Sequence, residues 1–298
     1  MKFQKSTIFP FALIILLATA CSSEDSPKDE QEQEINPANQ KLVSITYPTS
    51  SNLAYMNDKQ EYQYDDLSRI KLNGAIEIKY VSDDLIETNL LEDNMSNVDL
   101  EAKTFIKLKD KNIVSFIGNR VFKKLTGEVT SIDRDSTVIS YENGYLFKLV
   151  TYFKSITTGS TGKYYLQKQI DFTITNGNIT QTKTTEYGDV VVTNYTYDSS
   201  PYIPMGDFGY ETPLHKVGLI KPLFYNKLGK SSANNIIKIE NVFTKTPFQK
   251  SYKTISFKRN FDKYGRISEI LLSGSCVTSN PDNVATDFTD EKVLFEYK

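Results

Sequence analysis

Residues Lys253–Arg259, with the sequence KTISFKR, decide the fold class, because apolar and polar side chains alternate along them. The same alternation of apolar and polar residues occurs in AIEIKYV at Ala75–Val81 and in KVLFEY at Lys292–Tyr297. A period of two gives a strand one buried and one wet face, the usual state of strands in antiparallel sheets. The chain also has 19 Tyr and 17 Phe, with no Trp, and aromatic residues favour strands. We therefore expect an all-β protein.

Turn residues separate the alternating segments. They occur at Asp83-Asp84, Lys109–Asn112, Asn143-Gly144 and Asn176–Asn178. Asn-Gly between apolar runs is a strong hairpin signal, because both residues tolerate positive φ. The sequence predicts one large antiparallel meander of hairpins over residues 41–298, forming an open or partly closed barrel-like sheet. A single β domain of this size is common.

Two hairpins share a short internal repeat. YDDLSRI at Tyr64–Ile70 aligns without gaps to FDKYGRI at Phe261–Ile267. We expect the aspartate to cap each turn, the small residue to take the strained position, and Arg-Ile to open the return strand. The predicted turn residues are Asp65, Arg69, Asp262, Gly265 and Arg266.

Residues 199–235 interrupt the alternation. They contain Pro201, Pro204, Pro213, Pro222 and the sole histidine of the chain, His215. Prolines at this density exclude a central strand. We expect one long Pro/Gly-rich loop here, with a short helix near Leu214–Leu228. Long ordered loops in β domains are often functional, but a structural plug over one sheet face fits the same composition.

The N-terminus has the pattern of a bacterial export signal. Lys2 and Lys5 precede an apolar run at Ile8–Leu17, and the small residues Ala18–Ala20 follow it. This run is too short to span a bilayer, which takes about 20 apolar residues. We expect residues 1–20 to be a signal peptide and Cys21 to be the lipid attachment point of a lipoprotein.

Residues 21–40 are predicted to be a lipidated, flexible tether. Six acidic residues and one lysine lie between Ser22 and Glu34, and so polar a segment cannot bury enough surface to fold. The start CSSED at Cys21–Asp25 resembles the export signal of surface lipoproteins in the Bacteroidota. The resemblance implies a lipid-anchored protein of the outer membrane, at the cell surface; the periplasmic face is the alternative.

Charge and cysteine content exclude two classes of protein. Of 35 basic and 37 acidic side chains, 32 and 31 remain beyond residue 40. A near-neutral body lacks the basic stripe of nucleic-acid-binding proteins. Cys276 is the one thiol besides Cys21, so the folded body can form no internal disulfide. We expect Cys276 to be a small buried side chain.

Two further motifs occur beside the lipoprotein signal and the hairpin repeat. Tyr197-Asp198 leads into Pro201 and Pro204, and SSANNIIKI follows at Ser231–Ile239. Together these features resemble a Bacteroidota lipoprotein family of unknown function with a porin-like β fold. The hairpins are also similar to the Tyr-Asp repeats of large secreted shell proteins. The family has no known catalytic residues to transfer. Membrane-spanning strands are not expected, because the strands direct Lys, Glu, Asp and Thr outward.

Signatures of catalysis, metal binding and cofactor binding are missing from the sequence. It contains no Gly-x-Ser-x-Gly elbow, His-Glu-x-x-His, Cys-x-x-Cys or phosphate-binding glycine loop. We expect no cofactor and no metal, and His215 to be a hydrogen-bonded loop residue. Carboxylate pairs leave one enzymatic alternative, a glycan hydrolase, and the same acids are alternative oxygen ligands for calcium, although their spacing fits no EF-hand loop. The acidic groups are Asp83, Asp84 and Glu87, and Asp282, Asp287, Asp290 and Glu291.

Tyrosines are the best candidates for a binding surface, because the ring offers flat, amphipathic contact area for glycans or peptides. The predicted surface comprises Tyr164, Tyr165, Tyr202, Tyr210 and Tyr225, although any of them can instead pack in the core. We expect a non-enzymatic, lipid-anchored module of the cell envelope that binds a glycan, a peptide or an envelope partner. The alternatives are the hydrolase and a purely architectural lipoprotein.

Overall fold

The structure, a computed structural model, describes residues 41–47, 59–90, 94–95, 98–157, 162–203, 212–213, 225–282 and 286–298. For residues 94, 95, 98, 99 and 225 it describes the backbone alone. All of these residues belong to one compact unit, Gln40–Lys298. The predicted signal peptide, Cys21 and the acidic tether lie outside the described residues.

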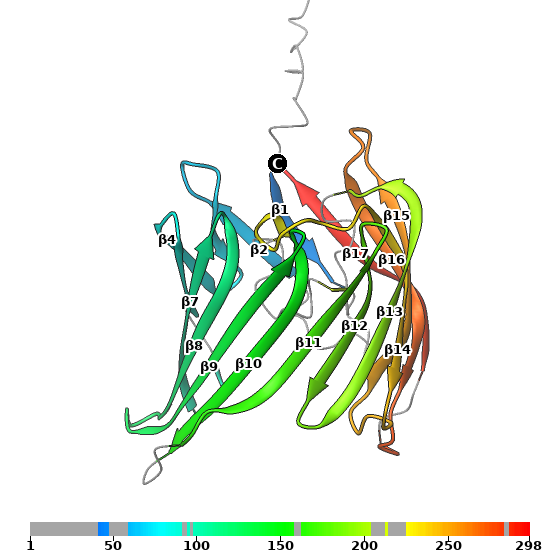
Figure 1. Cartoon of the computed structure of the whole chain (residues 1–298). Helices are drawn as coiled ribbons and strands as arrows, with labels where there is room; N and C mark the ends of the chain where they lie inside the picture. The colour runs from blue at the N-terminus through cyan, green and yellow to red at the C-terminus, as the bar shows by residue number, and fades with distance from the viewer. Residues whose placement is uncertain are drawn as a thin grey trace, which may run out of the picture. The chain divides into compact units, whose positions relative to one another are not determined.

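The described residues form 17 strands in one sheet (Figure 1). The first strands are short: β1 (Leu42–Thr46), β2 (Lys59–Tyr64), β3 (Ile70–Asn73), β4 (Ile76–Ser82), β5 (Leu85–Leu90) and β6 (Asn94–Met95). Longer strands follow: β7 (Val98–Lys109), β8 (Asn112–Lys124), β9 (Val129–Glu142), β10 (Tyr145–Thr157), β11 (Tyr165–Thr175) and β12 (Asn178–Glu186). The last are β13 (Asp189–Pro201), β14 (Asn234–Phe243), β15 (Ser251–Phe261), β16 (Ile267–Val277) and β17 (Asp287–Tyr297).

The sheet closes into a barrel. Antiparallel pairing connects neighbours along the chain, with β5 and the two-residue β6 both pairing with β7. Strand β1 then pairs with β17 on one side and with β2 on the other. Backbone hydrogen bonds of 2.9 Å run in both directions between Lys41 and Lys298. The all-β meander is confirmed, and the sheet is fully closed where the sequence left it open or partly closed.

The barrel has two distinct ends. Because successive strands alternate in direction, Lys41 and Lys298 share one end with the β9–β10 and β11–β12 turns (Figure 1). We call this the terminal end. The opposite end carries the β8–β9, β10–β11 and β12–β13 connections. Strands β1 to β5 are short, whereas β7 to β13 extend toward the opposite end (Figure 1).

The inner wall of the barrel is largely apolar. Two clusters of buried side chains line it, one around Ile45, Ile239 and Val293 and the other around Ile106 and Leu149. Alternate strand positions supply these side chains, as the period of two predicts. The inner wall therefore carries the hydrophobic core of the described residues.

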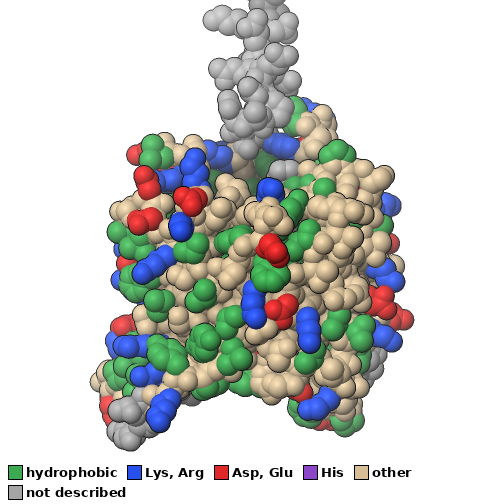
Figure 2. All heavy atoms as spheres, viewed as in Figure 1, with side chains coloured by type: hydrophobic (Ala, Val, Ile, Leu, Met, Phe, Trp, Pro, Cys, Tyr) green, Lys and Arg blue, Asp and Glu red, His purple; other side chains and the backbone are tan. Residues whose placement is uncertain are grey.

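The outer wall carries charged side chains of both signs. Lys79 lies 2.9 Å from Glu77, and Lys148 lies 3.7 Å from Asp171 across β10 and β11. Figure 2 shows such charges scattered among apolar side chains on the viewed face. The outward Lys, Glu and Asp expected from the sequence are found on these strands. Among the described residues, no helix is long and apolar enough to cross a membrane.

Local chemistry explains the tight turns. Asn143 and Gly144 have φ angles of 52° and 85°, and Asn176 and Gly177 have 51° and 78°. Two consecutive positive φ angles give the turn twist that matches the flanking strands, and Asn-Gly adopts them with little strain. Both hairpins form where the sequence predicts them.

The repeated motif builds two similar turns. The carboxylate of Asp65 accepts hydrogen bonds from the backbone N–H groups of Leu67 and Arg69, at 3.0 and 2.8 Å. That of Asp262 accepts from Tyr264 and Arg266, at 2.9 and 3.0 Å. Each carboxylate also bonds the Nε of its arginine, at 2.7 Å in the first copy and 2.8 Å in the second.

These contacts affect the acidity of both aspartates. Partial desolvation acts to raise the pKa of each carboxyl group, but the hydrogen bonds and the charge of the adjacent arginine outweigh it. The net pKa of Asp65 and of Asp262 is therefore lowered, and both stay ionised at neutral pH. The small residue has positive φ in each copy, 63° at Ser68 and 76° at Gly265.

The long connection is shorter than predicted at both ends. Strand β13 includes Ser199–Pro201, and β14 begins at Asn234. Pro201 fits because it is the last residue of its strand, where the missing N–H is not needed. Of the expected helix near Leu214–Leu228, the described part is a 3-10 turn, η3 (Tyr225–Lys227). Residues 204–211 and 214–224, with Tyr210 and His215, lie outside the described residues.

Candidate functional site

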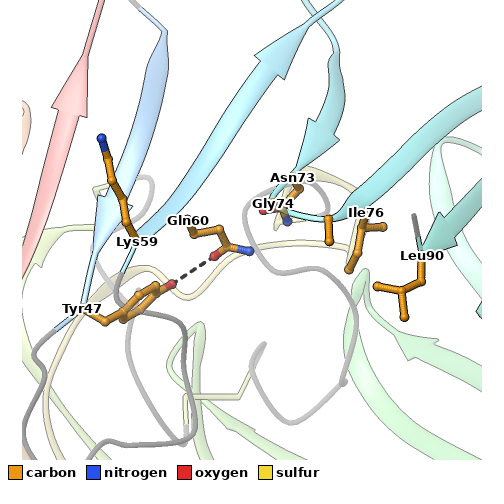
Figure 3. Close-up of a pocket in the computed structure, with 8 residues that line it drawn as sticks. Tyr47, Lys59, Gln60, Asn73, Gly74, Ile76 and Leu90 are labelled. Carbon is orange, nitrogen blue, oxygen red and sulfur yellow. Dashed lines mark hydrogen bonds between the residues drawn. The ribbon is translucent and has the colours of Figure 1, made fainter. Parts of the chain in front are cut away.

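A small pocket opens in the inner wall where the short strands end. It has a volume of about 220 Å³ and lies between the end of β1, the start of β2, the β3–β4 turn and the end of β5 (Figure 3). The strand register turns Gln60 and Asn73 inward, because Gln60 lies opposite buried Ile45 and Asn73 lies opposite buried Tyr62. The lining residues are Tyr47, Lys59, Gln60, Asn73, Gly74, Ala75, Ile76 and Leu90.

Asn73 is the most unusual group of the pocket. Its side chain is 1% exposed, yet neither its Oδ1 nor its Nδ2 has a hydrogen-bond partner. Buried side-chain amides in folded proteins are nearly always satisfied. Leaving such a group unpaired costs about 1–3 kcal/mol. The pocket therefore presents one acceptor and a donor group that are already desolvated and unused.

Gln60 is held in place by two phenols. Its Oε1 accepts hydrogen bonds from the hydroxyls of Tyr62 (3.1 Å) and Tyr47 (3.3 Å). Burial, helped by neighbouring Tyr64, raises the pKa of Tyr62, so this phenol stays protonated and able to donate. The Gln60 amide nitrogen then points away from Tyr47, toward the side of the pocket where Asn73 lies (Figure 3).

The interior of the pocket carries no formal charge among its described residues. The ammonium group of Lys59 extends away from Gln60 (Figure 3) and pairs with Glu61 at 3.3 Å and Glu296 at 3.9 Å. Ile76 and Leu90 form the apolar wall beyond Asn73 (Figure 3). Two amides beside an apolar wall suit a small, neutral group with both hydrogen-bonding and methyl surface.

The predicted tyrosine surface is divided between the two ends of the barrel. Tyr164 and Tyr165 are 50% and 45% exposed and precede or begin β11 at the opposite end. Tyr202 follows β13 at the terminal end, where its backbone N–H donates to Ala233. Tyr225 begins η3, but its side chain is not described, and Tyr210 lies outside the described residues.

Two members of the first predicted acidic group make local contacts. Glu87 bonds Lys103 at 2.8 Å, and Asp84 accepts from Ser82 at 2.5 Å. Within the described ranges, no three His, Cys, Asp or Glu side chains converge as metal ligands do. Cys276 is buried, and burial raises the pKa of its thiol. Neither acidic group faces the Asn73 pocket.

Comparison with known proteins bears on the fold. The chain matches no family model and no curated protein sequence. It is similar to the crystal structure of a porin-like protein from Bacteroides vulgatus, with 12% identity and a TM-score of 0.53 over 86% of this chain and 98% of that chain. A porin-like protein from Bacteroides uniformis has 11% identity and a TM-score of 0.47, over 86% of this chain and 96% of that one.

The first similarity establishes a shared fold. The porin-like β fold that the sequence resemblance implied is thereby confirmed, while membership of the lipoprotein family stays a prediction. A fold alone does not define an activity.

Sequence reasoning missed Gln60 and Asn73. Neither belongs to a recognisable motif, and both lie on short strands. One local signal was present: Asn73-Gly74 is a further Asn-Gly pair, and Gly74 has a φ of 57°. That signal predicts a turn, but it does not show that the asparagine side chain is buried without a partner.

Proposed function

We propose that this protein is a lipid-anchored lipoprotein of the cell envelope whose barrel is a non-enzymatic glycan-binding module. The Asn73 pocket would hold an acetamido group of an N-acetylated sugar. The unpartnered carboxamide of Asn73 carries this proposal. An acetamido group offers one N–H and one C=O to the two amides, and its methyl group suits the wall formed by Ile76 and Leu90.

Pocket size supports a small ligand. Sites for drug-sized molecules occupy about 300–1,000 Å³, and this pocket has about 220 Å³. One sugar substituent fits that space better than an extended peptide. Among the described residues, the side chains that face into the pocket are uncharged, which favours a neutral group over a phosphate or a carboxylate.

Strand length supports anchoring by lipid. A strand that crosses a membrane needs about 9–11 residues, whereas β1, β2 and β3 have five, six and four. Outward ion pairs such as Lys79–Glu77 would also be costly in lipid. The proposed lipid on Cys21 would instead attach the protein, and Lys41, the first described residue, lies at the terminal end of the barrel.

Binding of free N-acetylglucosamine and N-acetylgalactosamine tests the pocket. Titration calorimetry should detect binding of at least one sugar to residues 36–298, and Asn73→Leu should weaken it more than tenfold. Asn241→Leu is the matched control, because both polar side-chain atoms of this buried asparagine have a hydrogen-bond partner elsewhere on the inner wall. If neither sugar binds the folded wild-type protein, or if Asn73→Leu binds as well as wild type, the pocket does not have this role.

A further inference from the structure

A second group of polar side chains faces inward at the opposite end of the barrel. The register places Arg120 of β8 opposite Asp133 of β9, and Asp133 opposite Ser155 of β10. Asp135 lies two residues further along β9 and therefore on the same face. That face is the inner one, because it continues to fully buried Thr137. The longest strands thus bring a cationic and two anionic side chains together inside the barrel.

An aromatic ring completes the group. Phe153 lies opposite Asp135 on one side and opposite Tyr165 on the other. The rings of Phe153 and Tyr165 meet edge to face, with centroids 5.7 Å apart. Partial desolvation, the hydroxyl of Tyr187 and the charge of Asp133 raise the pKa of Tyr165. The register and the ring contact together place Tyr165 on the inner face beside Phe153.

Solvent reaches these inward side chains. Tyr165 is 45% exposed, and the side chains of Arg120 and Asp135 are 42% and 22% exposed. Inward residues nearer the middle of the barrel, such as Thr137 and Leu149, are buried. The inner wall is accordingly accessible at the opposite end, and we call Arg120, Asp133, Asp135, Phe153 and Tyr165 the mouth cluster.

The polar groups of the mouth cluster have unused hydrogen-bonding capacity. Arg120 has five N–H donors, but its described contact is one long bond of 3.4 Å from a terminal nitrogen to Asp135. Its Nε is buried without a partner. Asp133 accepts one hydrogen bond from Ser155 at 2.7 Å, and a carboxylate can accept about four.

Gly118 makes room for this arrangement. It lies opposite Asp135, and a Cβ at this position would stand 2.6 Å from a carboxylate oxygen of Asp135. The carboxylate therefore lies over the glycine, and a larger residue at position 118 would displace the Asp135 side chain.

We propose that the mouth cluster is a second carbohydrate-binding site, which takes a neutral stretch of a glycan chain. Carboxylates and a guanidinium can bind the adjacent hydroxyls of a sugar, while the exposed ring of Tyr165 stacks on its apolar face. Two carboxylates against one arginine disfavour anionic ligands such as phosphates. This inference rests on the proposed function for its class of ligand, but not on the Asn73 pocket.

Two neighbouring tyrosines allow a matched test. Tyr165 points inward, whereas Tyr164 lies against the outward Lys154, whose ammonium is 5.6 Å from its ring centroid. The probes are soluble neutral oligosaccharides of glucose, mannose, galactose and N-acetylglucosamine. Wild type should bind at least one, Tyr165→Ala should bind it about tenfold more weakly, and Tyr164→Ala should bind it as wild type does.

Two substitutions that each remove a negative charge give an independent readout. Asp133→Asn and Asp135→Asn keep the side-chain shape, and each should weaken oligosaccharide binding more than tenfold while leaving the melting temperature close to that of wild type. Binding of the free N-acetylated sugar that the Asn73 pocket takes should survive all mouth variants and weaken more than tenfold in Asn73→Leu, which separates the two sites.

Three results would overturn the inference. They are absence of binding to every oligosaccharide in the panel, equal effects of Tyr164→Ala and Tyr165→Ala, and cleavage of a bound oligosaccharide that stops in Asp133→Asn or Asp135→Asn. The last would identify the hydrolase that the sequence left as an alternative.

Discussion

Single side chains show how stability and binding compete in this barrel. Asn73 keeps a carboxamide unpaired on the inner wall, while Asn241 on the same wall accepts from Thr193 at 2.6 Å and donates to Tyr252 at 2.9 Å. The two residues have the same chemistry and similar burial. Because their partners differ, an identical substitution should have opposite effects.

Replacing both asparagines by leucine tests this difference. Asn73→Leu should raise the free energy of unfolding by about 1 kcal/mol, because it removes an unpaired buried amide from a site of similar volume. Asn241→Leu should lower it by about 2–3 kcal/mol, because it leaves Thr193 and the Tyr252 carbonyl without partners. Urea denaturation measures both. A loss of stability in Asn73→Leu would show that the carboxamide serves the fold rather than a ligand.

At the scale of elements, the two repeat turns are a natural pair for comparison. They share the aspartate cap and the arginine, but the residue with positive φ is Ser68 in one and Gly265 in the other. A side chain in the left-handed region costs about 1–2 kcal/mol. Glycine avoids that cost but loses more chain entropy on folding.

Exchanging the two residues should change stability in opposite directions. Ser68→Gly should stabilise the protein and Gly265→Ser should destabilise it, each by about 0.5–1 kcal/mol. No heavy atom lies within 4 Å of a Cβ built at Gly265, so the effect there comes from backbone strain and not from a clash. Thermal unfolding of the two single variants provides the comparison, and shifts of the same sign would contradict the shared geometry.

The whole barrel places both candidate sites away from its terminal end. Gln60 is the second residue of β2 and Asn73 ends β3, while the mouth cluster lies near the end of β10 and the start of β11. The chain enters and leaves the barrel at Lys41 and Lys298, at the other end. A lipid on Cys21 would therefore attach the protein through the end that carries no candidate site.

Protease treatment of intact cells tests this arrangement. We expect the wild-type protein to be digested while a periplasmic marker survives, because the lipid would hold it at the outer surface. Cys21→Ala should abolish lipidation and release the protein from the membrane fraction. Protection of the wild-type protein would place it on the periplasmic side, and the search for its glycan would move there.

The turns and strands that the sequence predicts depend on neighbouring residues. The Asn-Gly pairs at 143 and 176 specify turns because the positive φ angles depend on two adjacent residues. The alternation in Lys253–Arg259 specifies β15 because strand faces repeat every second residue. The sequence predicts Tyr164 and Tyr165 as surface residues. Only the strand register shows that the Tyr165 ring faces inward and the Tyr164 ring outward.

Tertiary structure decided closure and both candidate sites. Closure depends on pairs such as Ile45 with Phe295, which are too distant in the chain for any local pattern to encode. The pocket depends in the same way on register, since a shift by one residue would turn Gln60 and Asn73 to the outer face. The sequence by itself determined which segments are strands and where they turn; pairing between distant strands determined which polar side chains meet inside the barrel.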